Sequence, residues 1–307
     1  MNTIDVRDLT KEYGGRRAVD QLTFSVRPGR VTGFLGPNGA GKSTTLRLVL
    51  GLDHATSGSA TVDGRRYPEL REPLRRVGAL LDAGAAHGSR TGRDHLRALA
   101  VSNRIPAGRV DQLLAETGLE PAALRRVRTY SLGMRQRLGI AAALLGDPGV
   151  VLLDEPSNGL DPEGIVWIRH LLRRLAAEGR TVLVSSHLMS ETAAFADHLV
   201  VLGRGRLLAD TPVRDFIHAR VRPAARIRTT DDGRLAELLA RHGRDAARGA
   251  DGAWTVRHAH VEELGRLLAG AAVPVLELTQ EQATLEQAYL DLTATDAEFT
   301  AQHHQEA

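Results

Sequence analysis

A glycine-rich stretch at residues 36–44, GPNGAGKST, constrains the fold more than any other feature of the chain. It fits the pattern G-x-x-x-x-G-K-[ST] from Gly36 to Ser43. The residues before it, VTGFL, are apolar like a buried strand, and STTLRLVLGL after it has apolar residues at helical spacing. Loop glycines let backbone N–H groups converge on phosphate oxygens, and the N-terminus of the following helix adds a positive dipole. The stretch therefore predicts a strand–loop–helix unit that binds phosphate groups.

Arginine dominates the basic residues of this chain, yet the glycine loop carries a lysine. Of 40 basic residues 38 are arginines, and the two lysines are Lys11 and Lys42. Lys42 must reach the β- and γ-phosphates of a nucleotide through a crowded loop. An ammonium is a compact charge with rotatable donors, whereas a guanidinium is larger and holds its donors in a fixed fork. We therefore predict that Lys42 binds these phosphates, with Ser43 holding Mg²⁺ and Thr44 supporting the phosphates.

The overall composition argues against several other classes of protein. The 307 residues are 42% hydrophobic and 25% charged, as in a globular protein, and the lack of cysteine excludes disulfides and thiolate metal sites. No apolar run reaches the ~20 residues that a membrane-spanning helix needs. The net charge is only +3, basic residues are scattered, and aromatic residues make up 4% of the chain, so no nucleic-acid partner is expected.

Strand-like and helix-like segments alternate along the chain. Two alternating strands at the start, a helical stretch between about 90 and 146, and the buried strands GVVLLD and RTVLVSS predict a doubly wound α/β core. HLVVLGRGRLLAD is typical of a hairpin that turns at residues 203–205. A weaker series of strands and helices predicts a small α+β domain over 221–293, and we expect the polar tail, 294–307, to be disordered.

A second group of motifs occupies residues 130–162, YSLGMRQRLGIAAALLGDPGVVLLDEPSNGLDP. With this group the chain resembles the ATP-binding cassette (ABC) family from residue 1 to about 215. The family signature, usually LSGGQ, appears as YSLGM, which keeps Ser131 and Gly133 and departs at the other three positions. Taken alone, Ser131 is either a simple N-cap or the head of an anion-binding helix. The resemblance implies that Ser131 and Gly133 face the nucleotide of the opposite subunit.

The segment VVLLDEP resembles the Walker B strand of the same family. The resemblance implies that Asp154 holds the Mg²⁺ shell and that Glu155 polarises the water attacking the γ-phosphate. Two acids that merely capped a buried strand would be adjacent charges without a partner. SNGLDP carries Asp161 in a loop that in this family crosses to the other subunit. SSHLMSE carries His187, whose family counterpart contacts the γ-phosphate, although a lone histidine is more often a turn residue. Lys42, Glu155 and His187 are thus the candidate catalytic residues.

Two further positions are assigned through the resemblance. Tyr13, in KEYGGRRAV, matches the aromatic residue that stacks on adenine, although one aromatic also suits an ordinary strand end. Asp82 ends VGALLD, where the family usually has a glutamine that contacts Mg²⁺ or water and links the ATP site to the membrane subunit. An aspartate is shorter, charged and lacks the amide donor, and it would reach the metal through a water. The expected nucleotide contacts are Tyr13, Gly36, Pro37, Asn38, Gly39, Ala40, Gly41, Lys42, Ser43, Thr44, Ser131, Gly133 and Asp161.

The resemblance implies an α/β fold of the P-loop NTPase class and ABC ATPase type. We expect a mixed sheet core, an antiparallel β subdomain and a helical signature subdomain at about 90–146 within residues 1–215, followed by the small C-terminal α+β domain. Such a chain binds and hydrolyses ATP with Mg²⁺, forms a homodimer and powers a separately encoded transmembrane permease. It would lie in the cytoplasm, peripheral on the inner face of the cell membrane.

The segments VGALLD, SLGMRQRLG, SSHLMSE and TLEQAYLDLTA are similar to those of the drug- and antibiotic-export branch of the family. They favour export of a drug, antibiotic or other amphipathic molecule. The alternative is a soluble ABC ATPase acting on nucleic acid or ribosomes, although such proteins usually carry two cassettes or a long coiled-coil insertion. A drug-binding or interaction module without turnover would not need the intact set Lys42, Asp154, Glu155 and His187.

Overall fold

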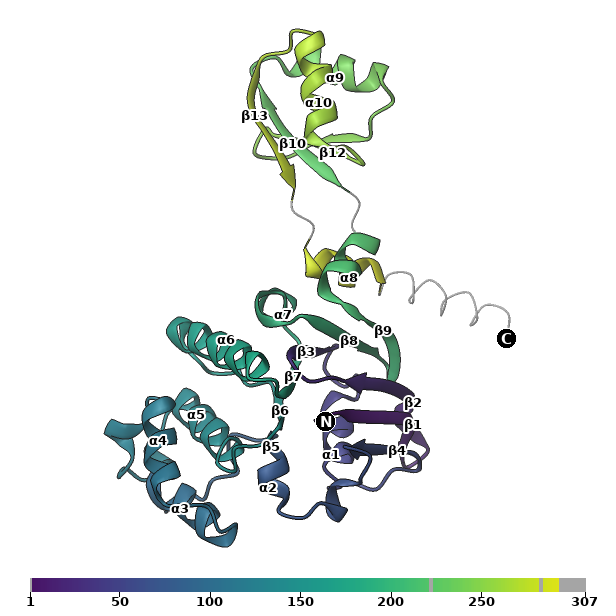
Figure 1. Ribbon diagram of the computed structural model, residues 1–307. Coiled ribbons are helices and arrows are strands. Elements are labelled where there is room, and N and C mark those ends of the chain that lie inside the picture. The colour runs from purple at the N-terminus through teal and green to yellow at the C-terminus, as the bar shows by residue number, and fades with distance from the viewer. Residues whose placement is uncertain (1, 221–222, 282–283, 293–307) are drawn as a thin grey trace. The chain divides into compact units, whose positions relative to one another are not determined.

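The computed structural model describes residues 2–220, 223–281 and 284–292, and the chain divides into two compact units between residues 213 and 214 (Figure 1). The tail expected to be disordered, 294–307, lies outside the described residues. Each unit has its own apolar core. Across the described ranges, no helix is both long enough and apolar enough to cross a membrane.

The centre of the first unit is a six-stranded sheet in the order β5-β6-β7-β3-β8-β9. Its first five strands run parallel, and β9 pairs antiparallel with β8 as the predicted hairpin. The strands are β3 (Arg30–Leu35), β5 (Val77–Leu80), β6 (Val150–Asp154), β7 (Thr181–Ser186), β8 (His198–Gly203) and β9 (Arg206–Pro212). Because β6, β7 and β3 are parallel neighbours, their carboxyl ends open at one edge of the sheet. The glycine loop, Glu155 and His187 all follow directly at that edge.

An antiparallel sheet, β2-β1-β4, shares its apolar core with the helix that follows the glycine loop. Its strands are β1 (Ile4–Tyr13), β2 (Arg16–Val26) and β4 (Ser57–Val62), and the helix is α1 (Lys42–Val49). Phe24 of β2 packs on Phe34 of β3 with ring centroids 5.5 Å apart, and Leu46 of α1 is fully buried in the same core. This packing fixes the glycine loop from both sides, because β3 precedes it and α1 follows it.

The helical region between residues 92 and 143 packs against the other side of the parallel sheet strands through a separate core. It contains α3 (Gly92–Ser102), α4 (Gly108–Glu116), α5 (Leu132–Ala143) and the short 3-10 helices η2 (Glu120–Ala122) and η3 (Val127–Thr129). Between β4 and β5, before this region, lie the 3-10 helix η1 (Tyr67–Glu69) and the short helix α2 (Pro73–Arg76). The backbones of α5 and β5 approach so closely that a Cβ on Gly78 would lie 1.9 Å from the carbonyl oxygen of Ala143. The helix carrying the signature is thereby held against a strand of the central sheet.

Two helices connect the later strands of the first unit. They are α6 (Pro162–Ala177), between β6 and β7, and α7 (Met189–Phe195), between β7 and β8. Ile168, Leu171 and Leu175 of α6 are buried, and their spacing places them on one face of the helix. Gly179 follows α6 with a left-handed φ of 83°, the conformation in which glycine commonly ends a helix.

The second unit is built around an antiparallel sheet in the order β11-β12-β10-β13. Along the chain its elements are β10 (Ala224–Thr229), α9 (Asp232–Arg241), β11 (Ala246–Arg248), β12 (Trp254–Arg257), α10 (Val261–Gly270) and β13 (Val275–Glu281). Ile227, Leu239 and Leu264 belong to the core between the sheet and the two helices. α8 (Val213–Arg220) precedes this sheet, and a helix at residues 285–292 follows it. The order makes two interleaved βαβ units.

Candidate nucleotide-binding site

The glycine loop joins β3 to α1 in a conformation that only glycine adopts easily at two positions. Gly39 and Gly41 have φ values of 80° and 101°. A Cβ on Gly41 would lie 2.5 Å from the carbonyl oxygen of Ala18 on β2, so the loop is pressed against that strand. α1 then begins at Lys42 without a side-chain cap, which leaves the N–H groups of its first turn directed at the loop. This is the arrangement that binds phosphate at a helix N-terminus.

The Lys42 side chain crosses the inside of the loop and is only 6% exposed. Its Nζ donates to the carbonyl oxygens of Gly36 at 2.7 Å and Pro37 at 3.3 Å. Burial lowers the pKa of Lys42, while the nearby carboxylates of Glu155 and Asp154 act in the opposite direction. Lys42 Nζ lies 3.7 Å from Glu155 Oε1, so the loop holds a compact and nearly buried positive charge beside this carboxylate.

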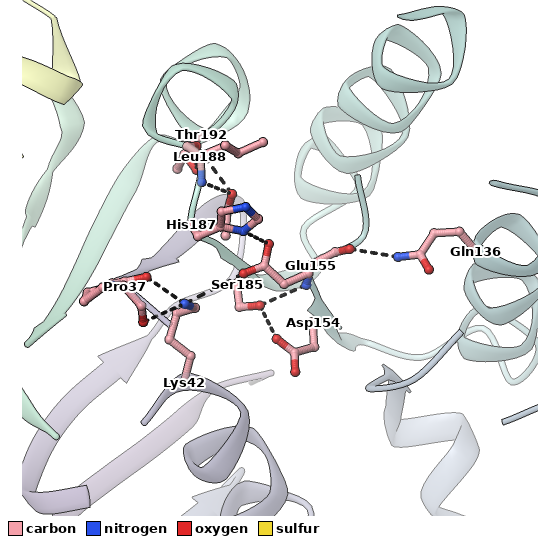
Figure 2. A network of polar contacts seen from close by, with 11 residues as sticks. Pro37, Lys42, Gln136, Asp154, Glu155, Ser185, His187, Leu188 and Thr192 are labelled. Carbon is pink, nitrogen blue, oxygen red and sulfur yellow. Dashed lines mark hydrogen bonds and ion pairs between the residues drawn. The ribbon is translucent and has the colours of Figure 1, made fainter. Parts of the chain in front are cut away.

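Four side chains at the ends of β6 and β7 are linked by hydrogen bonds beside Lys42, and Glu155 is the one that contacts it (Figure 2). His187 Nδ1 lies 2.8 Å from Glu155 Oε2, so Glu155 bridges the histidine and the lysine. Ser185 Oγ donates to Asp154 Oδ1 and accepts the backbone N–H of Glu155 at 2.9 Å. Glu155 itself has a left-handed φ of 48°, a strained conformation for a side-chain-bearing residue and common at functional sites. The sheet thus brings both Walker B acids and His187 to one point.

A further contact ties this point to the signature helix. Gln136 of α5 is buried, and its Nε2 donates to the backbone oxygen of Glu155 at 2.9 Å (Figure 2). Neither Gln136 nor Ser185 was predicted from the sequence to belong to the site. The register of β6 against β7 pairs Asp154 with Ser185. Ser185 can be recognised as part of the site only from this pairing.

Lys42 and Glu155 face a cavity of about 780 Å³ that is lined by residues 13, 16–18, 37–44, 155 and 204. Gly36, Asp154 and His187, which were also predicted for the site, are not among the lining residues. Tyr13 lies at this cavity and is 47% exposed. Its hydroxyl donates to Asp53 Oδ2 at 3.0 Å, and the same carboxylate binds Arg47 through two contacts of 2.8 and 3.2 Å. Lys11 Nζ lies 4.7 Å from the ring centroid. The phenol ring is therefore held in place with a surface directed at the cavity.

The remaining predicted site residues do not line this cavity. Ser131 caps α5 by accepting the N–H of Met134 at 3.2 Å, and Asp161 caps α6 by accepting the N–H of Gly164 at 2.9 Å. Gly133 lies against the loop that follows β6, because a Cβ on Gly133 would be 2.7 Å from the carbonyl oxygen of Gly159. Asp82 Oδ1 accepts the N–H of Gly84 at 2.6 Å.

Ser185→Ala is expected to lower the rate of ATP hydrolysis about 10- to 100-fold with a smaller change in KM for ATP. The alanine removes a hydrogen bond to a charged group, which is worth about 1.5–3 kcal/mol. It also removes the hydroxyl that hydrogen-bonds to both Asp154 and the backbone of Glu155. Steady-state kinetics on the purified variant measure the effect. Ser186→Ala is the matched control, because Ser186 Oγ accepts the N–H of Leu188 and contacts neither acid. Equal turnover in the two variants would contradict this role for Ser185.

Comparison with known proteins places this geometry in a family. The family model described as "ABC transporter" matches residues 19–158. The bacitracin transport ATP-binding protein BcrA of Bacillus licheniformis is 36% identical over 297 residues, which cover 94% of this chain and 96% of that protein. The chain belongs to the ABC transporter family. This ABC ATPase also matches a domain of unknown function, DUF8746, over residues 223–286.

Two other similarities bear on this ABC ATPase. The lantibiotic transport ATP-binding protein SrtF of Streptococcus pyogenes is 34% identical over 207 residues, which cover 67% of this chain and 90% of that protein. The solved structure of an ATP-binding subunit of an ABC transporter matches 70% of this chain and 92% of its own, with a TM-score of 0.65 and 28% identity. The family and the fold class predicted from the sequence are therefore confirmed, and the chain is an ATP-binding, ATP-hydrolysing subunit of an ABC transporter. Nothing supports the alternative of a nucleic-acid or ribosome partner.

Proposed function

We propose that this ABC ATPase powers the export of an antibiotic or another amphipathic compound through a separately encoded membrane permease. The observation that carries this proposal is the similarity to a bacitracin transport protein along almost the whole chain, which includes the second unit. A lantibiotic transport protein and the Nod factor export ATP-binding protein I of Burkholderia orbicola, 38% identical over 225 residues, add support. The domains are proposed at 1–215 for the nucleotide-binding part, with a helical subdomain at about 90–146, and at 221–293 for the accessory part.

Nucleotide binding is assigned to the loop and its surroundings. The backbone N–H groups of residues 36–44 and the ammonium of Lys42 would hold the β- and γ-phosphates. Tyr13 would stack on adenine, because its ring is fixed by Asp53 and directed at the cavity. Glu155 would orient and polarise the attacking water, and His187, hydrogen-bonded to it at 2.8 Å, would contact the γ-phosphate.

A Mg²⁺ ion fits the donors at the end of β6. Mg²⁺ prefers oxygen ligands, and the half-buried carboxylate of Asp154 and the hydroxyl of Ser43 supply them. Ser185 holds one oxygen of Asp154 and leaves the other available. The ion, when bound, would neutralise charge on the phosphates and supply electrostatic stabilisation. Asp82 is proposed to reach this ion only through a water.

A homodimer is proposed because the residues lining the cavity do not include the signature. Ser131 and Gly133 head a helix whose free N–H groups and dipole can hold an anion. A two-fold dimer would bring this helix end, with Asp161, to the nucleotide of the partner. The dimeric structure of a bacterial ABC transporter cassette, MJ0796, with a TM-score of 0.63 and 25% identity, supports this arrangement. The permease would hold the dimer at the inner face of the cell membrane.

Co-expression with its permease, sought among the neighbouring genes, tests the export proposal. A sensitive host carrying both proteins should tolerate the exported compound at several-fold higher concentration than a host carrying the permease with Lys42→Ala. In proteoliposomes the same compound should stimulate ATP hydrolysis by the complex and not by the isolated subunit. A complex whose hydrolysis no antibiotic stimulates, in a host that gains no tolerance, would overturn the proposal.

A further inference from the structure

The tight turn between β8 and β9 carries an arginine to the nucleotide cavity. Gly203 pairs with Arg206, so the connection is a two-residue loop of Arg204 and Gly205. Their φ values are 49° and 82°, the two positive angles of a type I′ hairpin turn. Arg204 lines the same cavity as the glycine loop, although 160 residues separate it from Thr44.

This turn is fixed to the phosphate-binding loop. The N–H of Gly205 donates to the carbonyl oxygen of Ala40 at 3.1 Å, and the oxygen of Gly205 accepts the N–H of Asp20 at 2.8 Å. Asp20 also binds Arg17 at 2.7 Å and Arg206 at 2.8 Å, and these two guanidinium groups lower its pKa. Arg204 is therefore held beside the middle of the glycine loop by contacts on both sides of the turn.

An arginine is an unusual residue for the first position of this turn. A type I′ turn favours asparagine or glycine there, because a left-handed φ strains other side chains. Arg204 is exposed, and among the described residues it makes no hydrogen bond or ion pair that would compensate. Its neighbour Arg17 at the cavity is already engaged by Asp20. A strained residue with a free charge at a binding site points to a role in binding.

We propose that Arg204 binds the α-phosphate of the nucleotide. The loop residues around Lys42 take the β- and γ-phosphates, and Tyr13 takes the base, so the cavity must also hold the ribose and α-phosphate. Gly205 contacts Ala40 on the loop, and a Cβ at this position would lie 3.0 Å from the carbonyl oxygen of Ala18. Ala18 lies on β2, the strand that forms a hairpin with the strand carrying Tyr13. Arg204 thus occupies the wall between the two ends of the nucleotide. The choice of α-phosphate rests on the proposed placement of adenine on Tyr13.

Arg204→Gly separates a binding role from a structural one. Glycine suits the φ of 49°, so the thermal midpoint of unfolding should stay the same or rise. Affinity for both ATP and ADP should fall about tenfold, the loss expected for one hydrogen bond between charged groups, because both nucleotides carry the α-phosphate. Arg204→Lys, which keeps the charge, should recover part of that loss. Isothermal titration at low ionic strength measures each affinity.

Two controls make the outcome decisive. Arg7→Ala removes an exposed arginine on β1 that lies outside the cavity, and it should leave both affinities unchanged. Lys42→Ala should lose ATP binding whether or not the role of Arg204 is correct. Unchanged affinities in Arg204→Gly would overturn the inference, and so would a loss confined to ATP, which would place the contact at the γ-phosphate. If Lys42→Ala bound ATP as well as the unmodified protein, the proposed nucleotide site itself would fail.

Discussion

Lys42→Ala is expected to abolish ATP binding, and Lys42→Arg is expected to lower ATP affinity by about 100-fold or more. The ammonium is nearly enclosed, with carbonyl oxygens at 2.7 and 3.3 Å, and a guanidinium adds atoms where the loop backbone already lies. A displaced loop would lose two or more hydrogen bonds to charged phosphate oxygens at about 1.5–3 kcal/mol each. Titration with ATP and steady-state hydrolysis measure both variants.

The chain offers one matched control for this substitution. Lys11→Arg exchanges the only other lysine, whose Nζ donates to the oxygen of His54 at 2.8 Å on the surface. Lys11 is half-buried and its Nζ lies 4.7 Å from the Tyr13 ring centroid, a contact that a guanidinium can also make, so affinity should change less than about twofold. Near-normal binding by Lys42→Arg would show that the shape of the cation is unimportant in the loop.

The parts of the site that were predictable are those encoded within one segment. The glycine loop, the Walker B strand and the hairpin each combine a residue pattern with a secondary-structure context, and every one forms as expected. Ser185 and Gln136 could not be predicted in this way. Their partners, Asp154 and Glu155, lie about 20 to 30 residues away, and strand register and helix packing bring them together.

The position of Arg204 beside the glycine loop could not be predicted from one segment of sequence either. The glycines around it predicted a hairpin, yet its contact with Ala40 joins two loops that meet only because β8 lies beside β3. In the second unit the series of strands and helices predicted from the sequence is present, but that prediction included neither α8 nor β11. That strand has three residues, Ala-Ala-Arg, and a segment so short has no periodicity to detect.

Glu155→Gln is expected to lower ATP hydrolysis at least 100-fold and to trap a dimer with ATP and Mg²⁺. The amide keeps the shape of a side chain held between Lys42 and His187 but removes the charge that polarises water. Because hydrolysis no longer resets the site, the ATP-bound dimer should persist. Light scattering after size exclusion should show a dimer with ATP and a monomer with ADP.

The proposed dimer rests on which residues surround the cavity. Lys42, Ser43 and Glu155 cover one side of the phosphates, and Ser131 is absent from the lining. In the proposed dimer, the N–H groups at the start of α5 of a second copy would complete the γ-phosphate site. ADP lacks that phosphate, so it removes the contact that joins the two copies. Adding Ser131→Arg to Glu155→Gln should prevent the dimer, because the bulky side chain occupies the helix end.

Glu120→Gln provides the matched control for loss of a carboxylate, since Glu120 is exposed and lies outside the cavity. It should hydrolyse ATP normally and remain monomeric after size exclusion. Circular dichroism would establish that each variant keeps its fold. A Glu155→Gln protein that binds ATP tightly yet stays monomeric, even with its permease present, would show that one chain completes the site alone. The free helix end at Ser131 would then need another partner, and the two-site arrangement would be wrong.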